Sequence, residues 1–210
     1  MAVRPVSRPA RKRPDAYHHG DLRRALLREA VRTIQAQGVD ALTLRAVAGR
    51  LGVSRTALYR HFADKQALLG AVAAEGFRTL RDALVSAWER EGRGRPGFEA
   101  MGRAYVRFAL EHPSHYRVMF GSAAVAPEPA PDDPGGSAFQ ALVDALVEQQ
   151  GQGLVRGDPP RLLALYVWSV VHGVAMLALD GQLKDDAPPA DVLMDFANER
   201  LRTGIAAAPV

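Results

Sequence analysis

One stretch, from Thr43 to Leu69, constrains this chain more than any other part of it. Two short apolar-periodic segments lie on either side of Gly52, and each has one side fit for burial. The apolar residues of the two segments are Val47, Ala48 and Leu51 in the first, and Leu58 and Phe62 in the second. Two short helices joined by a tight glycine turn form a helix-turn-helix, so this stretch predicts a helical unit built around that motif.

Polar residues precede each of these helices and are candidates for N-caps, which accept hydrogen bonds from the first backbone N–H groups of a helix. The candidates are Thr43, Ser54 and Asp64. We expect the corresponding helices over residues 44–51, over residues 55–62 and from residue 65 to about residue 91. Gly52 lies where the turn needs a positive φ, a conformation that glycine adopts at little cost.

The second helix of the motif has a polar side opposite Leu58 and Phe62 that is rich in hydrogen-bond donors. Such a side suits a helix that lies in the major groove of double-stranded DNA. Arginine can bridge O6 and N7 of guanine, and hydroxyl, imidazole and ammonium groups can reach phosphates. The predicted DNA-binding residues are Thr43, Arg45, Ser54, Arg55, Thr56, Tyr59, Arg60, His61 and Lys65.

The distribution of charge supports a polyanionic partner at one end of the molecule. The chain carries 14 Lys or Arg and 5 Asp or Glu up to Lys65, and 13 and 18 respectively after it. A basic first third on an acidic remainder indicates that one end meets a polyanion. Residues 1–16 have too little apolar surface to fold and are predicted to be a disordered basic arm. The arm either follows the DNA backbone or serves only as a solubilising tail.

The 210 residues contain no cysteine, which excludes disulfides, cysteine zinc sites and thiol catalysis and fits a cytoplasmic location. The apolar run from Leu162 to Leu179 is interrupted by polar residues and is barely long enough to span a membrane. We therefore expect a core helix there and no membrane partner. His112 and His115 lie on either side of Pro113 with no carboxylate cluster nearby, so we predict no metal site and no cofactor.

The remaining pattern predicts helices throughout, and hence an all-α fold. The first helix is expected over residues 17–37, where Gly38 ends it. The later helices are expected over residues 98–111, 114–120, 137–151, 160–179 and 190–205. Loops are expected over residues 92–97, 123–136 and 181–189, where Gly and Pro accumulate.

The first part of the chain resembles the DNA-binding domain of the TetR family of bacterial regulators. The resemblance covers about fifty residues with the loop spacing intact. It rests on Thr43-Leu44-Arg45, Ala48, Leu51-Gly52-Val53-Ser54, Leu58-Tyr59-Arg60-His61-Phe62, Asp64-Lys65 and Leu68-Leu69. It implies an all-helical homodimer whose N-terminal headpieces each enter one half of a roughly palindromic operator. The implied domains are a headpiece over residues 17–65 and, joined by a long helix, an effector-binding and dimerisation domain over residues 66–210.

A second, narrower resemblance is to the subgroup of this family with a Trp-His-Gly signature, carried by residues 116–120 and by Trp168 with His172-Gly173. Trp168 and His172 share one helix face, and Gly173 would let another helix approach. Two interpretations remain open for them: a hydrogen-bonded core, or the edge of a mostly apolar effector pocket. The candidate pocket residues are Trp88, Met101, Tyr105, Phe108, Met119, Phe139, Trp168, His172 and Met176.

The last two helices are expected to form the dimer interface, as two helices from each chain would make a four-helix bundle. This assignment rests mainly on the family resemblance. The candidate interface residues are Leu165, Val171, Leu179, Val192, Leu193, Phe196 and Leu201.

The resemblance and the residues together favour a transcription regulator, usually a repressor in this family, that a small and mostly apolar effector releases from its operator. One alternative is an architectural DNA-binding protein with little sequence preference, which would show a steep salt dependence. Another is an enzyme that uses the C-terminal cavity. The sequence has no nucleophile–base pair, phosphate loop or metal motif, so we predict that the protein is not an enzyme.

Overall fold

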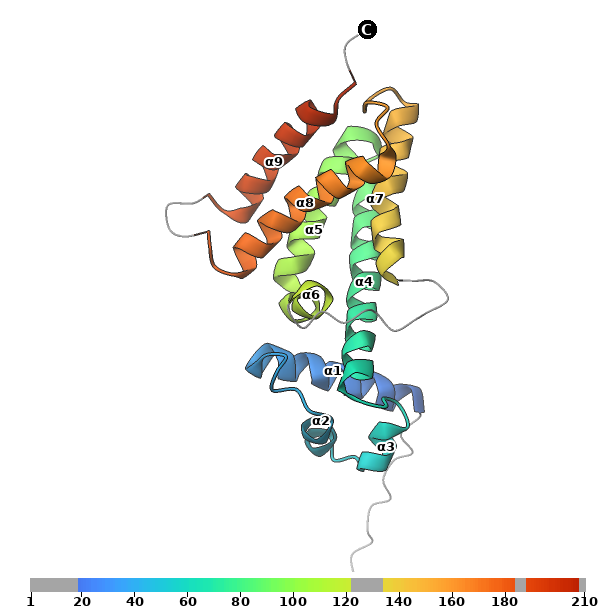
Figure 1. The fold of residues 1–210 in the computed structure, drawn as a ribbon, viewed down its shortest axis with the longest axis vertical. Helices are drawn as coiled ribbons and strands as arrows, with labels where there is room; N and C mark the ends of the chain where they lie inside the picture. The colour runs from blue at the N-terminus through green and yellow to red at the C-terminus, as the bar shows by residue number, and fades with distance from the viewer. Residues whose placement is uncertain (1–18, 122–133, 184–187, 208–210) are drawn as a thin grey trace, which may run out of the picture.

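The computed structural model describes residues 19–121, 134–183 and 188–207, and its regular structure is helical apart from one isolated β-bridge between Val155 and Ala206 (Figure 1). The predicted all-α fold is confirmed. The predicted arm and residues 123–133 of the expected loop lie outside the described residues. The described helices are α1 (His19–Gln37), α2 (Leu44–Leu51), α3 (Arg55–Tyr59), α4 (Lys65–Arg90), α5 (Gly94–Glu111), α6 (Pro113–Phe120), α7 (Pro134–Gly151), α8 (Pro160–Leu179) and α9 (Ala190–Ile205).

The local signals of the helix-turn-helix act as expected, and all three predicted N-caps are confirmed. The accepted backbone hydrogen bonds are Ala46 N to Thr43 Oγ1 (3.1 Å), Ala57 N to Ser54 Oγ (3.1 Å) and Ala67 N to Asp64 Oδ1 (2.8 Å). Gly52 ends α2 with a φ of 66°, the left-handed conformation that the turn was predicted to need.

The helix predicted over residues 55–62 is shorter in the structure, since α3 ends at Tyr59. The amides of His61 and Phe62 both donate to the carbonyl of Leu58, at 2.9 and 3.1 Å, so the chain tightens into a turn. This turn carries the Phe62 ring into the core, where it is 2% exposed. Asp64 then takes an extended conformation from which α4 can start in a new direction.

Two other boundaries differ from the prediction. The prediction of a loop over residues 92–97 is wrong, because α5 already begins at Gly94. Gly92 and Arg93 reverse the chain with φ values of 76° and 63°, and Pro96 is tolerated because the first turn of a helix has no intrahelical acceptor for its missing N–H. The start of α7 at Pro134 likewise places residues 134–136, predicted as loop, in a helix.

The helices form two lobes that share one long element (Figure 1). Helices α1 to α3 make the lower lobe, and α4 begins inside it and continues upward between α5 and α7. The lower lobe buries the apolar stripes predicted from the sequence. Its buried side chains include Leu26, Ala30, Ile34, Leu42, Val47, Ala48, Leu58, Phe62 and Leu68.

The two lobes also touch through α6, which packs against both α1 and α4. A Cβ at Gly76 of α4 would overlap Met119 Sδ and lie 3.1 Å from His115 Cβ, so the two helices approach closely at this glycine. At Gly173, by contrast, no atom of the described chain lies within 4 Å of the position that a Cβ would take, so no helix of the same chain makes a close approach there.

Helix α8 is the one described helix that is long and apolar enough, by length and composition, to cross a bilayer. A single helix of this kind is weak evidence for a membrane protein, because core helices meet the same criteria. Only some of its apolar side chains are buried. Leu162, Leu165 and Tyr166 are exposed, which leaves an apolar strip on one side of the helix.

Candidate functional site

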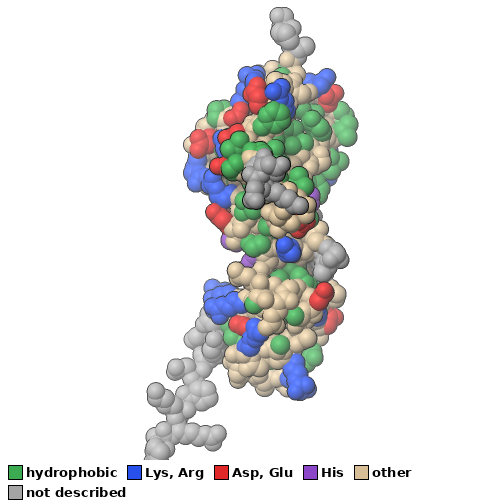
Figure 2. Space-filling view, turned by 90° about the vertical axis from the view of Figure 1, so that its left-hand side faces the viewer, with side chains coloured by type: hydrophobic (Ala, Val, Ile, Leu, Met, Phe, Trp, Pro, Cys, Tyr) green, Lys and Arg blue, Asp and Glu red, His purple; other side chains and the backbone are tan. Residues whose placement is uncertain are grey.

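The polar side of α3 is exposed over its whole length, while Leu58 on its other side is 1% exposed. Arg55, Thr56, Tyr59 and the following Arg60 all reach solvent. The upper lobe, formed by α5 to α9 and most of α4, is called the body from here on. Basic side chains appear at several points on the lower lobe, at the end of the molecule away from the body (Figure 2). This end therefore presents donors and positive charge on a firmly anchored turn of helix.

A shallow hollow of about 70 Å³ lies between α2 and α3, and it brings residues of both helices together. The apolar part of its lining consists of Leu44, Ala48 and Leu58, and the polar residues of the lining can contact a partner. Arg45, Arg55 and Tyr59 share this hollow, although ten residues separate the two arginines in the chain. Two guanidinium groups beside one phenol suit a phosphate or a base edge.

The other predicted DNA-binding residues differ in their exposure and in the hydrogen bonds that they already make within the protein. Thr43 and Ser54 are exposed, and their hydroxyls are used as helix caps. Lys65 is partly buried, and its ammonium donates to the carbonyl of Asp40 at 3.2 Å, so in this structure it ties α4 to the loop after α1. His61 is also partly buried. The contacts of all nine residues with DNA stay predictions.

One polar cluster that supports this surface was missed in the sequence. Glu29 of α1 is 7% exposed, and Arg50 of α2 donates to its Oε1 at 3.3 Å and to Thr33 Oγ1 at 3.1 Å. The pair fixes α2 against α1, and Arg32 adds a second cation 3.6 Å from Glu29. A basic and an acidic residue 21 positions apart give no sequence signal of contact.

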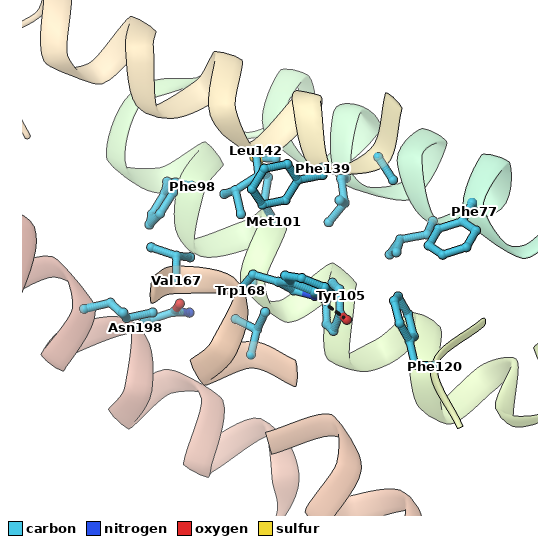
Figure 3. A pocket seen from close by; sticks show the side chains of 16 residues that line it. Phe77, Phe98, Met101, Tyr105, Phe120, Phe139, Leu142, Val167, Trp168 and Asn198 are labelled. Atoms are coloured by element: carbon cyan, nitrogen blue, oxygen red, sulfur yellow. Dashed lines mark hydrogen bonds between the residues drawn. The ribbon is translucent and has the colours of Figure 1, made fainter. Parts of the chain in front are cut away.

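The body contains an apolar cavity of about 230 Å³ (Figure 3). None of the side chains that line it is charged, and its polar members are Tyr105, Trp168 and Asn198. Its wall comes from six helices. The lining residues are Phe77, Leu80 and Leu84 of α4, Phe98, Met101, Gly102 and Tyr105 of α5, Phe120 of α6, Ala138, Phe139 and Leu142 of α7, Val167, Trp168 and Val171 of α8, and Asn198 and Leu201 of α9.

The structure brings only part of the predicted pocket set to this cavity. The predicted residues that line it are Met101, Tyr105, Phe139 and Trp168. Phe108 and Met119 are buried elsewhere in the core, and Trp88 borders a separate polar groove between α4 and α7. His172 and Met176 are partly buried on α8 and do not line the cavity.

Trp168 and His172 are joined by a hydrogen-bond network that runs from the cavity wall to α6. The indole Nε1 of Trp168 donates to the hydroxyl of Tyr105 at 2.9 Å. The hydroxyl of Tyr116 lies 2.7 Å from His172 Nδ1 and 3.2 Å from the Tyr105 hydroxyl, which itself lies 3.0 Å from Nδ1. In the tautomer with its proton on Nε2, Nδ1 has one lone pair, and Tyr116, the nearer of the two hydroxyls, donates to it.

Burial keeps every member of this network neutral. It raises the pKa of Tyr105 to about 12 and also raises that of Tyr116, and it lowers the pKa of His172. A neutral imidazole accepts at one nitrogen, and here that nitrogen is Nδ1. The network therefore consists of neutral hydrogen bonds between α5, α6 and α8, with two members, Tyr105 and Trp168, on the cavity wall.

The lowered pKa of His172 predicts that the protein loses stability as pH falls from about 7.5 to about 5.5. A free imidazole has a pKa of about 6.5, so below this pH the unfolded chain binds a proton that the folded chain resists. The stability is therefore present above that pKa and is lost below it. Glu75, whose pKa is lowered mainly by its hydrogen bond with His115, acts only at more acidic pH.

Urea denaturation at pH 7.5 and 5.5 measures this effect. The variant His172→Gln keeps a hydrogen-bonding side chain that does not titrate, and its midpoint should depend less on pH than that of the original protein. The same loss of stability in both proteins would contradict the role of His172.

The seven candidate interface residues fall into three groups by exposure. Leu165, Val192 and Phe196 are 49%, 53% and 58% exposed, which is unusual for large apolar side chains. Leu179 and Leu193 are partly buried. Val171 and Leu201 are buried and line the cavity, so a partner chain cannot reach them as the chain is folded here. Leu162 and Tyr166 add exposed apolar surface that the prediction did not include.

In the described part of the chain, no group of three or more His, Asp or Glu side chains is arranged to hold a metal ion. His112 and His115 lie with their ring centroids 5.9 Å apart, and His115 Nε2 is 3.5 Å from Glu75 Oε1. These groups lie where α6 meets α4 and form part of the contact between those helices.

Two family profiles match the chain. Residues 26–72 match the profile described as bacterial regulatory proteins of the tetR family, and residues 98–201 match the tetracyclin repressor-like C-terminal domain. The first match contains α2 and α3 with their exposed surface. The second contains most of the cavity wall.

Individual proteins agree with these matches. An uncharacterized HTH-type transcriptional regulator of Mycobacterium tuberculosis is 29% identical, over 93% of this chain and 85% of its own length. The class C tetracycline repressor protein of Escherichia coli is 47% identical over 51 residues, which are 24% of this chain and 23% of the repressor. A solved structure of a protein of unknown function from Rhodococcus sp. RHA1 superposes with a TM-score of 0.81, at 37% identity, covering 92% of this chain and all of that one.

Proposed function

The chain belongs to the TetR family of bacterial transcriptional regulators, and on that premise we propose that it is a repressor released from its operator by a small, mostly apolar effector. It is a DNA-binding regulator and not an enzyme. The finer parts of the proposal are the contacts with DNA, the homodimer, the effector and the sign of regulation. Separate features of the molecule support the DNA contacts, the homodimer and the effector, while the sign of regulation rests on the family alone.

One observation carries the proposal: α4 begins at the DNA-facing end and forms a wall of the cavity with its second half. Its N-terminal residues Leu68 and Leu69 are buried with the headpiece, and Phe77, Leu80 and Leu84 line the cavity. A molecule that fills the cavity therefore contacts the same helix whose first turn is buried with the headpiece and follows α3 after a short turn. A change in the tilt of α4 would alter how two headpieces fit DNA, and the effector would favour the tilt that it binds better.

Helix α6 offers a second connection between cavity and headpiece. Tyr116 on α6 is hydrogen-bonded to Tyr105, which lines the cavity, and Phe120 at the end of α6 lines the cavity itself. The same helix packs on α1. The network thus gives an effector a route to the headpiece that does not depend on α4 alone.

The exposed apolar side chains on α8 and α9 support a homodimer through these helices. A monomer has little reason to expose Leu165, Tyr166 and Phe196 on neighbouring helices, whereas an isologous pair would cover them. Two headpieces would then meet successive major grooves, about 34–36 Å apart, on a roughly palindromic operator. We place this dimer in the cytoplasm, where the operator is.

The Trp-His-Gly subgroup remains part of the proposal. It is supported by the hydrogen-bonded contact of Trp168 and His172 with Tyr105. No specific observation favours the alternative of an architectural DNA-binding protein. That alternative would also leave the cavity in the body without a function.

Replacing Arg55 by alanine tests the DNA-reading role of α3. We expect the variant to lose preference at one operator position, at a cost of about 1–3 kcal/mol, because a guanidinium in the major groove discriminates between bases. The measurement is a binding titration over single-base variants of an operator obtained by selection from random duplexes.

Arg107→Ala is the matched control, since this arginine is exposed on α5 in the body. It should leave both affinity and base preference unchanged. An Arg55→Ala protein with an unaltered base preference would rule out this arginine as a base-reading residue. Equal binding of the unmodified protein to all duplexes would favour the architectural alternative.

A further inference from the structure

The chemistry of the cavity wall identifies a class of effector more narrowly than apolarity does. The wall carries no charged side chain, so an ionic ligand would lose its hydration without gaining a counter-charge. The volume of about 230 Å³ is larger than the roughly 150 Å³ that encloses a benzene molecule. In proportion, this cavity fits a neutral molecule of roughly ten heavy atoms.

The donors on the wall are already used within the protein. The indole N–H of Trp168 is donated to Tyr105. With Tyr116 donating to the single lone pair of His172 Nδ1, the hydroxyl hydrogen of Tyr105 has its acceptor at the Tyr116 oxygen, 3.2 Å away. The centre of the cavity therefore offers a ligand aromatic faces and apolar side chains.

Asn198 is the exception, and it lies at one end of the cavity (Figure 3). The residue is 5% exposed, and its Nδ2 is anchored by donating to the carbonyl of Glu99 at 3.2 Å. Its Oδ1 accepts no hydrogen bond from the described residues. That oxygen lies 2.9 Å from the position of a Cβ at Gly102, which also lines the cavity, so the absence of a side chain at Gly102 makes room for it.

This oxygen is an acceptor that a ligand donor can reach, and a ligand that filled this end of the cavity without a donor would desolvate it at a cost in free energy. From the opposite end of the cavity, Phe77 and Phe120 offer only aromatic surface. We propose that the effector is a neutral alcohol or phenol with an apolar body, whose hydroxyl donates to Asn198 Oδ1 while the body extends toward Phe77 and Phe120. This inference rests on the proposed function, since it assigns the chemistry of the ligand that the cavity would bind.

Two probes that differ in one group test the proposal: 4-butylphenol, which has the donor, and 4-butylanisole, in which a methyl group replaces the hydroxyl hydrogen. Binding is measured by calorimetry on the full-length protein, with tryptophan fluorescence, to which Trp168 on the cavity wall contributes, as a second readout. We expect the phenol to bind about tenfold or more tightly than the anisole, as expected for one buried hydrogen bond made or left unmade.

Three variants make the assignment specific. Asn198→Leu, which has a similar volume and no acceptor, should bring the two affinities to within about twofold, and Asn198→Ala should do so without any risk of overpacking. Retained binding of the anisole shows that each variant still has a folded cavity. Phe77→Leu, at the other end, should weaken both probes alike and preserve their ratio.

The possible outcomes separate this inference from the function on which it rests. Equal binding of both probes to the original protein overturns the role of Asn198 but leaves a ligand-binding cavity. An unchanged ratio in both Asn198 variants also overturns it. Failure of both probes to bind at millimolar concentration contradicts the alcohol or phenol and the apolar effector together, while operator binding would still support the regulator.

Discussion

Replacing Phe62 by alanine is expected to unfold the DNA-binding end of the molecule while the body stays folded. The ring is 2% exposed, lies in the core of α1 to α4, and is covered by the guanidinium of Arg23 at 5.2 Å from its centroid. Removing a buried phenylalanine costs about 3–5 kcal/mol, because packing contacts are lost and a cavity is left. A lobe this small has little stability to lose.

The two tryptophans make the experiment selective. Trp88 and Trp168 both lie in the body, so their fluorescence reports the body alone, whereas circular dichroism reports all helices. In the Phe62→Ala variant, the urea denaturation curve followed by circular dichroism should gain an additional transition at low urea concentration. The midpoint of the curve followed by tryptophan fluorescence should stay unchanged. Phe62→Leu is the control and should lose far less. A shift of both signals together would contradict a separately folding headpiece over residues 17–65.

Placing charges on the exposed face of α8 and α9 is the second large effect that we expect. In the variant carrying Leu165→Glu and Phe196→Glu, two carboxylates per chain would enter the proposed dimer interface, and symmetry doubles their number. Interface anchors of this kind are worth about 2 kcal/mol or more each, but their values are not additive. We therefore expect the four substitutions of the symmetric pair to cost at least about 4 kcal/mol together, or roughly a thousandfold in dissociation constant.

Analytical ultracentrifugation measures the dimer, and operator titration measures its consequence, because a monomer carries only one headpiece. Val147→Glu is the matched control: this valine on α7 is 49% exposed, like Leu165, but lies outside the proposed interface. It should leave the dimer intact. An unchanged dimer in the double variant would place the interface elsewhere.

Much of the fold could be predicted because its signals are local. The caps at Thr43, Ser54 and Asp64 and the left-handed turn at Gly52 each depend on a few neighbouring residues. The end of α3 could not be predicted, because helical spacing and a tight turn both bury Phe62 beside Leu58. The direction in which α4 continues after residue 64 decides between a longer α3 and a tight turn, and tertiary packing sets that direction.

The cavity was harder to predict than the DNA-facing surface for the same reason. Tyr105, Tyr116 and His172 meet although up to 67 residues separate them, and Asn198 reaches the carbonyl of Glu99 over a separation of 99. Apolar periodicity identifies the buried face of a helix but not what that face meets. Val171 and Leu201 illustrate this, since their positions fit an interface equally well and they line the cavity.

The length of α4 sets a scale for the signal that it can carry. Its 26 residues span about 39 Å. If the helix pivots at its C-terminal end, a tilt of about 5° moves its first turn by about 3 Å. That displacement is close to the spacing of about 3.4 Å between stacked bases. In the proposed mechanism, a side-chain-sized adjustment around the cavity would thus be enough to move α3 by one base-pair step, and loss of register on DNA would need no large rearrangement.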